Sequence, residues 1–133
     1  ASQGHLTSAV GVVDAQERVF RELGDRRSLL RVLIDKGCML LELGQLDKAS
    51  IALTEGEDLA RLVNNPKCLV DCKMLQAGVV ARRGDERGAA AELEHALALA
   101  TEHGFQERAE ILRQKLAAGD LEVVHARTEN TGL

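Results

Sequence analysis

Apolar residues recur at every third or fourth position along most of this chain, which is the spacing of one face of an α-helix. In the segment 47–63 the apolar positions are Ala49, Ala52, Leu53, Leu59, Ala60 and Val63. Charged residues fill most of the positions between them, and the segment 86–103 repeats this pattern. We therefore expect amphipathic helices near 7–23, 26–43, 47–63, 66–82, 86–103 and 105–118.

Glycine and asparagine punctuate these helices at regular intervals. Gly24, Asn64 and Gly104 are spaced 40 residues apart, and both residue types tolerate the left-handed backbone conformation that ends a helix. A second series with the same spacing, which predicts a second and tighter turn, consists of Gly4, Gly44 and Gly84. Because one helical hairpin cannot bury its apolar stripe alone, successive hairpins should stack. We predict an all-α fold, an antiparallel helix-hairpin solenoid of about six helices.

Composition agrees with a helical fold and argues against several classes of protein. Only 2% of the residues are aromatic, so Leu and Ala, which favour helices over strands, have to fill the core. No apolar run approaches the roughly 18–20 residues that cross a bilayer, and we expect no membrane association. A net charge of −4 and few aromatic side chains argue against nucleic-acid binding. Three cysteines, an odd number, suit a reducing compartment, so we expect a cytoplasmic protein.

Reactive residues are present, but their spacing is not typical of an active site. Cys68 and Cys72 are four residues apart and share a helical face, yet two ligands do not complete a metal site, and we interpret them as small core residues. Cys68 falls in the first turn of the expected helix 66–82, where the helix dipole favours thiolate, so it should be the most reactive thiol if exposed. Glu17 and other carboxylates have cationic neighbours, as on a solvated helix face. We expect no enzymatic activity, no metal and no cofactor.

The 40-residue repeat resembles the tetratricopeptide repeat family, in the longer-unit variant familiar from large bacterial regulators and light-chain-like cargo adaptors. Gly37 takes the family's small-residue position, where paired helices approach closely. Ala49 and Ala89 begin the packing ridge of the second helix, and Leu53 and Leu93 take its large apolar position. The resemblance is strongest over 30–63 and 70–103.

The resemblance also divides the chain into units. It implies a half-unit at 4–24, full units at 26–63 and 66–103, and a half-unit at 105–118, so that residues 1–118 form the solenoid. Residues 119–133 should form a C-terminal tail or a degenerate further helix. The family usually has large aromatic residues at two positions that are occupied in the second unit by Lys73 and Glu86. These polar residues should make the second unit less regular than the first.

In the resembling family, the first helices of successive hairpins line a concave groove that holds a peptide or a partner helix. Carried over residue by residue, this groove would be lined by Arg31, Ile34, Asp35, Cys38, Leu41, Glu42, Asp71, Met74, Leu75, Gly78, Ala81 and Arg82. Its floor would be apolar and its margins charged. We therefore expect a protein-interaction module, a fragment of a larger scaffold or regulator, that binds a protein or peptide partner.

Two other functions are compatible with the same residues. Exposed terminal helices would allow the chain to pair into homodimers, which gives a self-association module with a structural role. The apolar residues Leu29, Leu30, Val32 and Leu33 should leave some surface for such pairing. A redox or small-molecule sensor that uses Cys68 and Cys72 is the third function.

Overall fold

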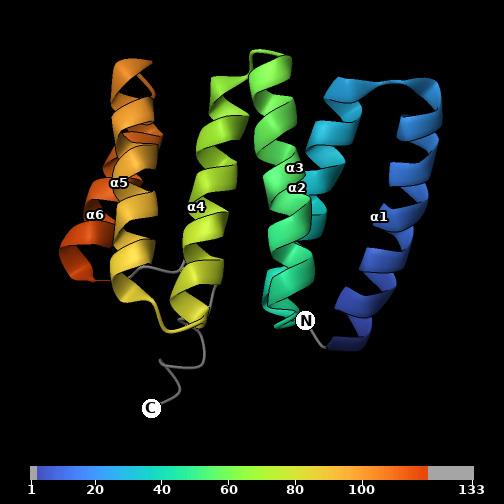
Figure 1. Ribbon diagram of the computed structural model, residues 1–133, viewed down its shortest axis with the longest axis horizontal. Coiled ribbons are helices and arrows are strands. Elements are labelled where there is room, and N and C mark those ends of the chain that lie inside the picture. Colours follow the sequence, from blue (N-terminus) through green and yellow to red (C-terminus); the bar gives the residue numbers. More distant parts are fainter. Residues whose placement is uncertain (1–2, 120–133) are drawn as a thin grey trace.

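Six α-helices and no strand make up the part of the chain that the computed structural model describes, residues 3–119. The helices are α1 (Gln3–Leu23), α2 (Arg26–Glu42), α3 (Leu46–Leu62), α4 (Pro66–Arg82), α5 (Glu86–Glu102) and α6 (Gln106–Ala118). They stand side by side as a row of antiparallel rods (Figure 1). The predicted all-α helix-hairpin fold is confirmed. The last five helices begin and end within one residue of their expected ranges, and α1 begins earlier than expected.

The joints between these helices share one geometry. Near the end of each of the first five helices one residue has a positive φ, and these residues, spaced 20 apart, are Gly24, Gly44, Asn64, Gly84 and Gly104. At every joint the next N–H donates to a carbonyl five residues earlier, as Gln45 does to Leu40, which is the Schellman pattern of a helix C-terminus. The expected tighter turn at Gly44 and Gly84 is therefore wrong, because both glycine series close the same cap.

Gly4 is a second exception to the expected turns, because it lies inside α1. Glycine permits the positive φ of a turn but does not require it, and here the chain continues as helix. The starts of three later helices are capped by side chains. Asp25, Asn65 and Asp85 each accept a hydrogen bond from the backbone N–H three residues further on, at 3.1, 3.1 and 2.8 Å. Pro66 begins α4, a position where its missing N–H would have no partner inside the helix.

The helices form an open row. Each helix packs against the next, and the backbones of α2 and α4 also approach each other. The backbone of α1 approaches only α2, and that of α6 approaches only α5, so the two end helices of the described part lie far apart (Figure 1). Each helix thus contacts near neighbours only, as in a solenoid and unlike a closed bundle.

Buried glycines let neighbouring helices approach closely. A Cβ atom added to Gly37 of α2 would lie 2.5 Å from Cδ2 of Leu53 in α3. A Cβ atom added to Gly56 of α3 would lie 3.0 Å from Sγ of Cys72 in α4. These contacts confirm the close approach expected at Gly37. The other small and large positions predicted in the core are fully buried: Ala49, Leu53, Ala89 and Leu93.

The division into repeat units stays a prediction. The joint between α3 and α4 has the same geometry as the joint between α2 and α3, so the backbone does not mark where one hairpin ends. The expected tail or degenerate helix lies beyond residue 119, outside the described residues. Within residues 3–119, none of the helices combines the length and the apolar character that a membrane span requires.

Candidate functional site

The face predicted as a binding groove is formed by α2 and α4, which lie next to each other. The four residues expected at its apolar floor are buried: Ile34 and Leu41 are 6% and 0% exposed, and Met74 and Leu75 are each 7% exposed. Ile34, Leu41 and Leu75 belong to one core cluster that joins α2, α3 and α4. These side chains therefore offer a partner little accessible surface, because packing between the helices already uses them, and the groove itself stays a prediction.

The accessible part of this face is charged and polar. Arg31, Asp35 and Glu42 of α2 are exposed. The half-buried residues are Cys38, Asp71, Ala81 and Arg82, and Gly78 is buried. Two of these charges serve the fold: Asp71 accepts hydrogen bonds from Arg108 of α6 at 2.9 and 3.1 Å, and Arg82 donates to the carbonyl of Leu41 at 2.8 Å. The side chains that this face leaves accessible are therefore mainly the charged residues of α2.

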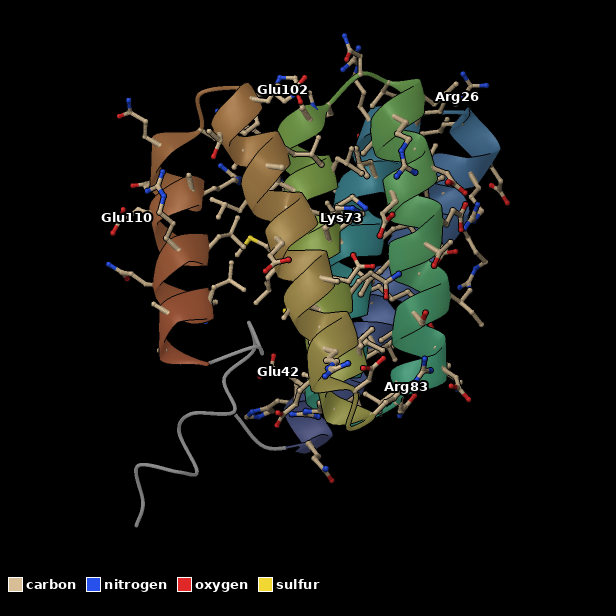
Figure 2. The ribbon with its side chains drawn as sticks, turned by 60° about the vertical axis from the view of Figure 1, so that its left-hand side comes forward. Arg26, Glu42, Lys73, Arg83, Glu102 and Glu110 are labelled. Atoms are coloured by element: carbon tan, nitrogen blue, oxygen red, sulfur yellow. The ribbon has the colours of Figure 1, made fainter. Side chains whose placement is uncertain are left out.

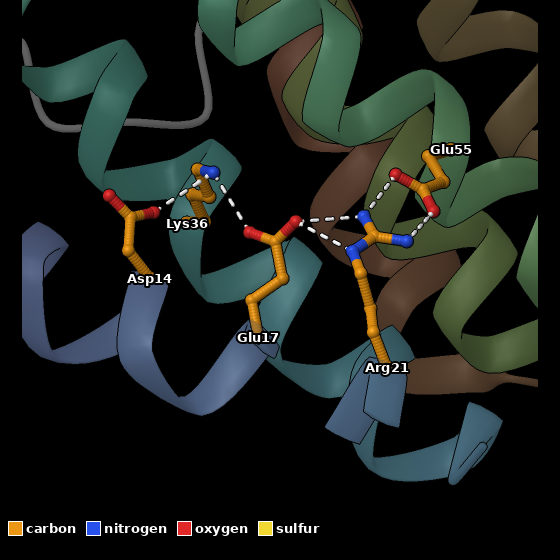
Figure 3. Close-up of polar contacts among 5 residues, drawn as sticks. All are labelled: Asp14, Glu17, Arg21, Lys36 and Glu55. Carbon is orange, nitrogen blue, oxygen red and sulfur yellow. Dashed lines mark hydrogen bonds and ion pairs between the residues drawn. The ribbon is translucent and has the colours of Figure 1, made fainter. Parts of the chain in front are cut away.

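A network of five charged side chains joins the first three helices (Figure 3). Lys36 of α2 lies 2.9 Å from both Asp14 and Glu17 of α1. Arg21 of α1 contacts Glu17 one turn earlier at 2.7 Å and also donates two hydrogen bonds of 2.7 Å to Glu55 of α3. The guanidinium therefore bridges two carboxylates from helices whose backbones do not touch.

This network lines a pocket of about 360 Å³ between α1 and α3. Leu33 and Leu40 of α2 contribute to its lining, as do Val10 of α1 and Ile51 of α3. Glu17 and Arg21 are four residues apart on one helix, so their contact is local, but nothing in the sequence pattern connects them with Lys36 or Glu55. Such long-range pairs leave no periodic signal, because only the packing of helices decides which charges meet.

The pKa values of Glu17 and Lys36 move away from neutrality. Burial alone would raise the pKa of Glu17, but hydrogen bonds from Lys36 and Arg21 outweigh it and the pKa of Glu17 is lowered. Burial would lower the pKa of Lys36, yet its bonds to Glu17 and Asp14 raise it. General acids and bases work best with a pKa near the operating pH. The network is therefore suited to holding α1 against α2 and α3 rather than to moving protons.

The three thiols are held in their protonated form. Burial raises the pKa of Cys72 to about 12, and it also raises the pKa values of Cys68 and Cys38. Cys68 and Cys72 are buried, and Cys38 is half-buried. Cys68 was expected to be the most reactive thiol if exposed, and its burial means that this condition is not met. Among residues 3–119, no three His, Cys, Asp or Glu residues cluster as metal ligands.

Lys73, in a position where the resembling family usually holds an aromatic residue, has an ionic partner. Its Nζ lies 3.7 Å from Oε1 of Glu57 in α3, and both side chains are largely buried. Figure 2 shows Lys73 in the middle of the stack, whereas Arg26, Glu102 and Glu110 lie at its periphery. This pair links α3 to α4 in the way that Lys36 and Glu17 link α2 to α1.

Neither a comparison with protein-family models nor one with curated protein sequences finds a match for this chain.

Proposed function

We propose that this chain is a protein-interaction module of the tetratricopeptide type, which binds a peptide or a partner helix along the face of α2 and α4. The observation that carries the proposal is the arrangement of that face. Exposed charges of both signs, Arg31, Asp35 and Glu42, follow one side of α2 beside the half-buried Cys38. The open row of helices and the 40-residue repeat support the assignment to this type.

The burial of the expected floor narrows the kind of partner. With Ile34, Leu41 and Leu75 committed to the core, little apolar surface remains on this face for the stripe of an amphipathic helix. An extended peptide that carries both acidic and basic residues matches the exposed Arg31 and Asp35 better. Recognition would then be electrostatic in part and would weaken as salt is added.

The proposal extends to the setting of the module. We propose that it serves within a larger scaffold or regulator in a reducing compartment such as the cytoplasm. Its three free cysteines, each with a raised pKa, support this setting, because none of them is used in a disulfide.

The test is a selection of binding peptides from a random display library, followed by NMR mapping of the tightest peptide on the labelled protein. We expect the largest amide shifts at Arg31, Asp35 and Cys38. Reversing two charges in the variant Arg31→Glu with Asp35→Arg should weaken binding at least tenfold, which corresponds to about 1.4 kcal/mol.

A matched control reverses two exposed charges on α3, Asp58→Arg with Arg61→Glu, and should leave the affinity unchanged. Both variants keep their charges at exposed positions and should remain folded, which circular dichroism checks. If the amide shifts fall on α1 and α3, or if the α3 variant loses binding as much as the α2 variant, the assignment of this face is wrong.

A further inference from the structure

The outer side of α1 carries an apolar stripe that the described helices leave uncovered. Val12, Val19 and Leu23 are 60%, 50% and 70% exposed. Together with the exposed small residues Gly4, Ser8 and Ala15, they follow one face of the helix at spacings of three and four. We call these six residues the α1 stripe. It spans roughly 100° of the helix surface, the width of a packing face in globular proteins.

The 40-residue repeat indicates that the α1 stripe is a surface against which another helix packs. Residues 40 further on occupy equivalent places in α3, where Ala52 is 4% exposed and Leu59 is half-buried. Both pack there against the preceding helix through Leu29 and Leu33 of α2. In α1 the equivalent residues are Val12 and Val19, and α1 stands at the end of the row with no described helix before it (Figure 1).

Another hairpin of the same array, placed before α1, would pack against α2 as well, in the way that α2 packs against α4. It fits this end of the row poorly, because α2 is polar at the positions that it would contact. In α4, Leu75 and Cys68 are each 7% exposed and belong to the core cluster that joins α4 to α2 and α3. The equivalent residues of α2 are Asp35, which is exposed, and Ser28. An incoming first helix would therefore place its apolar side on the carboxylate of Asp35, which costs desolvation energy without a partner. The apolar surface at this end is confined to α1.

A second copy of α1 fits the stripe when the two helices run antiparallel. If a twofold axis passes between residues 13 and 14, residue i lies opposite residue 27 − i of the other copy. Every large stripe residue then faces a small one: Leu23 faces Gly4, Val19 faces Ser8 and Val12 faces Ala15. In this register the helices, described over residues 3–23, overlap along almost their whole length. Large residues opposite small ones let two helices approach closely and interdigitate.

We infer that the protein forms a homodimer through antiparallel pairing of α1 with α1 of a second copy. The interface is isologous, so it closes after two copies and does not extend into a filament. The face of α2 and α4 proposed above for peptide binding lies outside this stripe, so the two inferences stand on different residues.

Sedimentation velocity over a dilution series of the full chain tests the dimer. We expect a monomer–dimer equilibrium, and Val19→Glu should weaken it at least tenfold because it places a charge opposite Ser8 in both halves of the interface. Leu23→Gln provides a second and milder variant. Leu62→Glu is the matched control, because Leu62 of α3 is 61% exposed but lies outside the stripe, and this variant should dimerise like the parent.

Oxidative cross-linking tests the register. The double variant Ser8→Cys with Val19→Cys should form covalent dimers, whereas Val19→Cys alone should not, because the two copies of residue 19 lie about 16 Å apart along antiparallel axes at 1.5 Å per residue. The parent protein, oxidised in the same way, should stay uncross-linked. A chain that remains monomeric at every concentration, assemblies that grow beyond two copies, or a Val19→Glu variant that is folded and still dimerises would each overturn the inference.

Discussion

Replacing Gly37 by alanine tests the closest helix contact of the fold. The added Cβ would lie 2.5 and 2.6 Å from Cδ2 and Cγ of Leu53, distances that no packed pair of carbons tolerates. Leu53 is 0% exposed and lies in the cluster that joins α2, α3 and α4, so it has little room to move aside. Either its rotamer changes or the two helices separate.

The magnitude follows from two opposing effects. Overpacking a filled core costs about 1–3 kcal/mol. Alanine in place of glycine inside a helix contributes about 1 kcal/mol of stabilisation through its propensity. The free energy of unfolding of Gly37→Ala should therefore fall by up to about 2 kcal/mol. Gly11→Ala in α1 is the matched control, because nothing lies within 4 Å of a Cβ at that position, and it should be stabilised by up to about 1 kcal/mol.

Urea unfolding followed by far-UV circular dichroism measures both changes, with the slope m as a check that the surface exposed on unfolding is the same. The decisive measurement repeats Gly37→Ala in a Leu53→Ala background. With the Leu53 side chain removed, Gly37→Ala should raise the free energy of unfolding instead of lowering it, so the effect of this substitution changes sign between the two backgrounds. A substitution at Gly37 that stabilises equally in both backgrounds would refute the close approach of α2 and α3.

Three further outcomes can be measured on single variants. Ala89→Arg should abolish the cooperative thermal transition, because Ala89 is 0% exposed and the arginine would be buried without a partner; an unchanged melting temperature would contradict the packing of α5. The lowered pKa of Glu17 stabilises the fold above pH 4.5, its ordinary value, and this contribution is lost as the pH falls through the folded-state pKa below it. Glu17→Gln should therefore reduce the loss of stability with falling pH in that acidic range. If the variant loses stability as steeply as the parent, Glu17 is not the group responsible. In the native protein a thiol reagent at neutral pH should modify the half-buried Cys38 first and Cys72 last, with rates that converge in denaturant; a fast reaction at Cys72 would exclude its burial.

The helices and their joints could be predicted from the sequence because the information that fixes them is local. An apolar period of three and four residues selects a helix, and glycine or asparagine at a C-terminus selects the left-handed residue that ends it. Gly24, Asn64 and Gly104 were located in this way. Gly4 was not, because glycine allows a turn but does not enforce one, and the identical geometry of the joints at Gly44 and Asn64 is a property of the backbone that residue types alone did not reveal.

The candidate site depended on tertiary structure, because burial and long-range ion pairs are decided by which helices meet. Ile34 and Leu75 are as apolar as the floor of a groove, but they pack against neighbouring helices in the core and are buried there. Arg21 and Glu55 show no periodic relation, yet the spacing of α1 and α3 around α2 places them in contact. Local residue patterns were enough to specify the helices and where each one ends. Which charges are paired, and which apolar face stays exposed on α1, depends on how these helices stack.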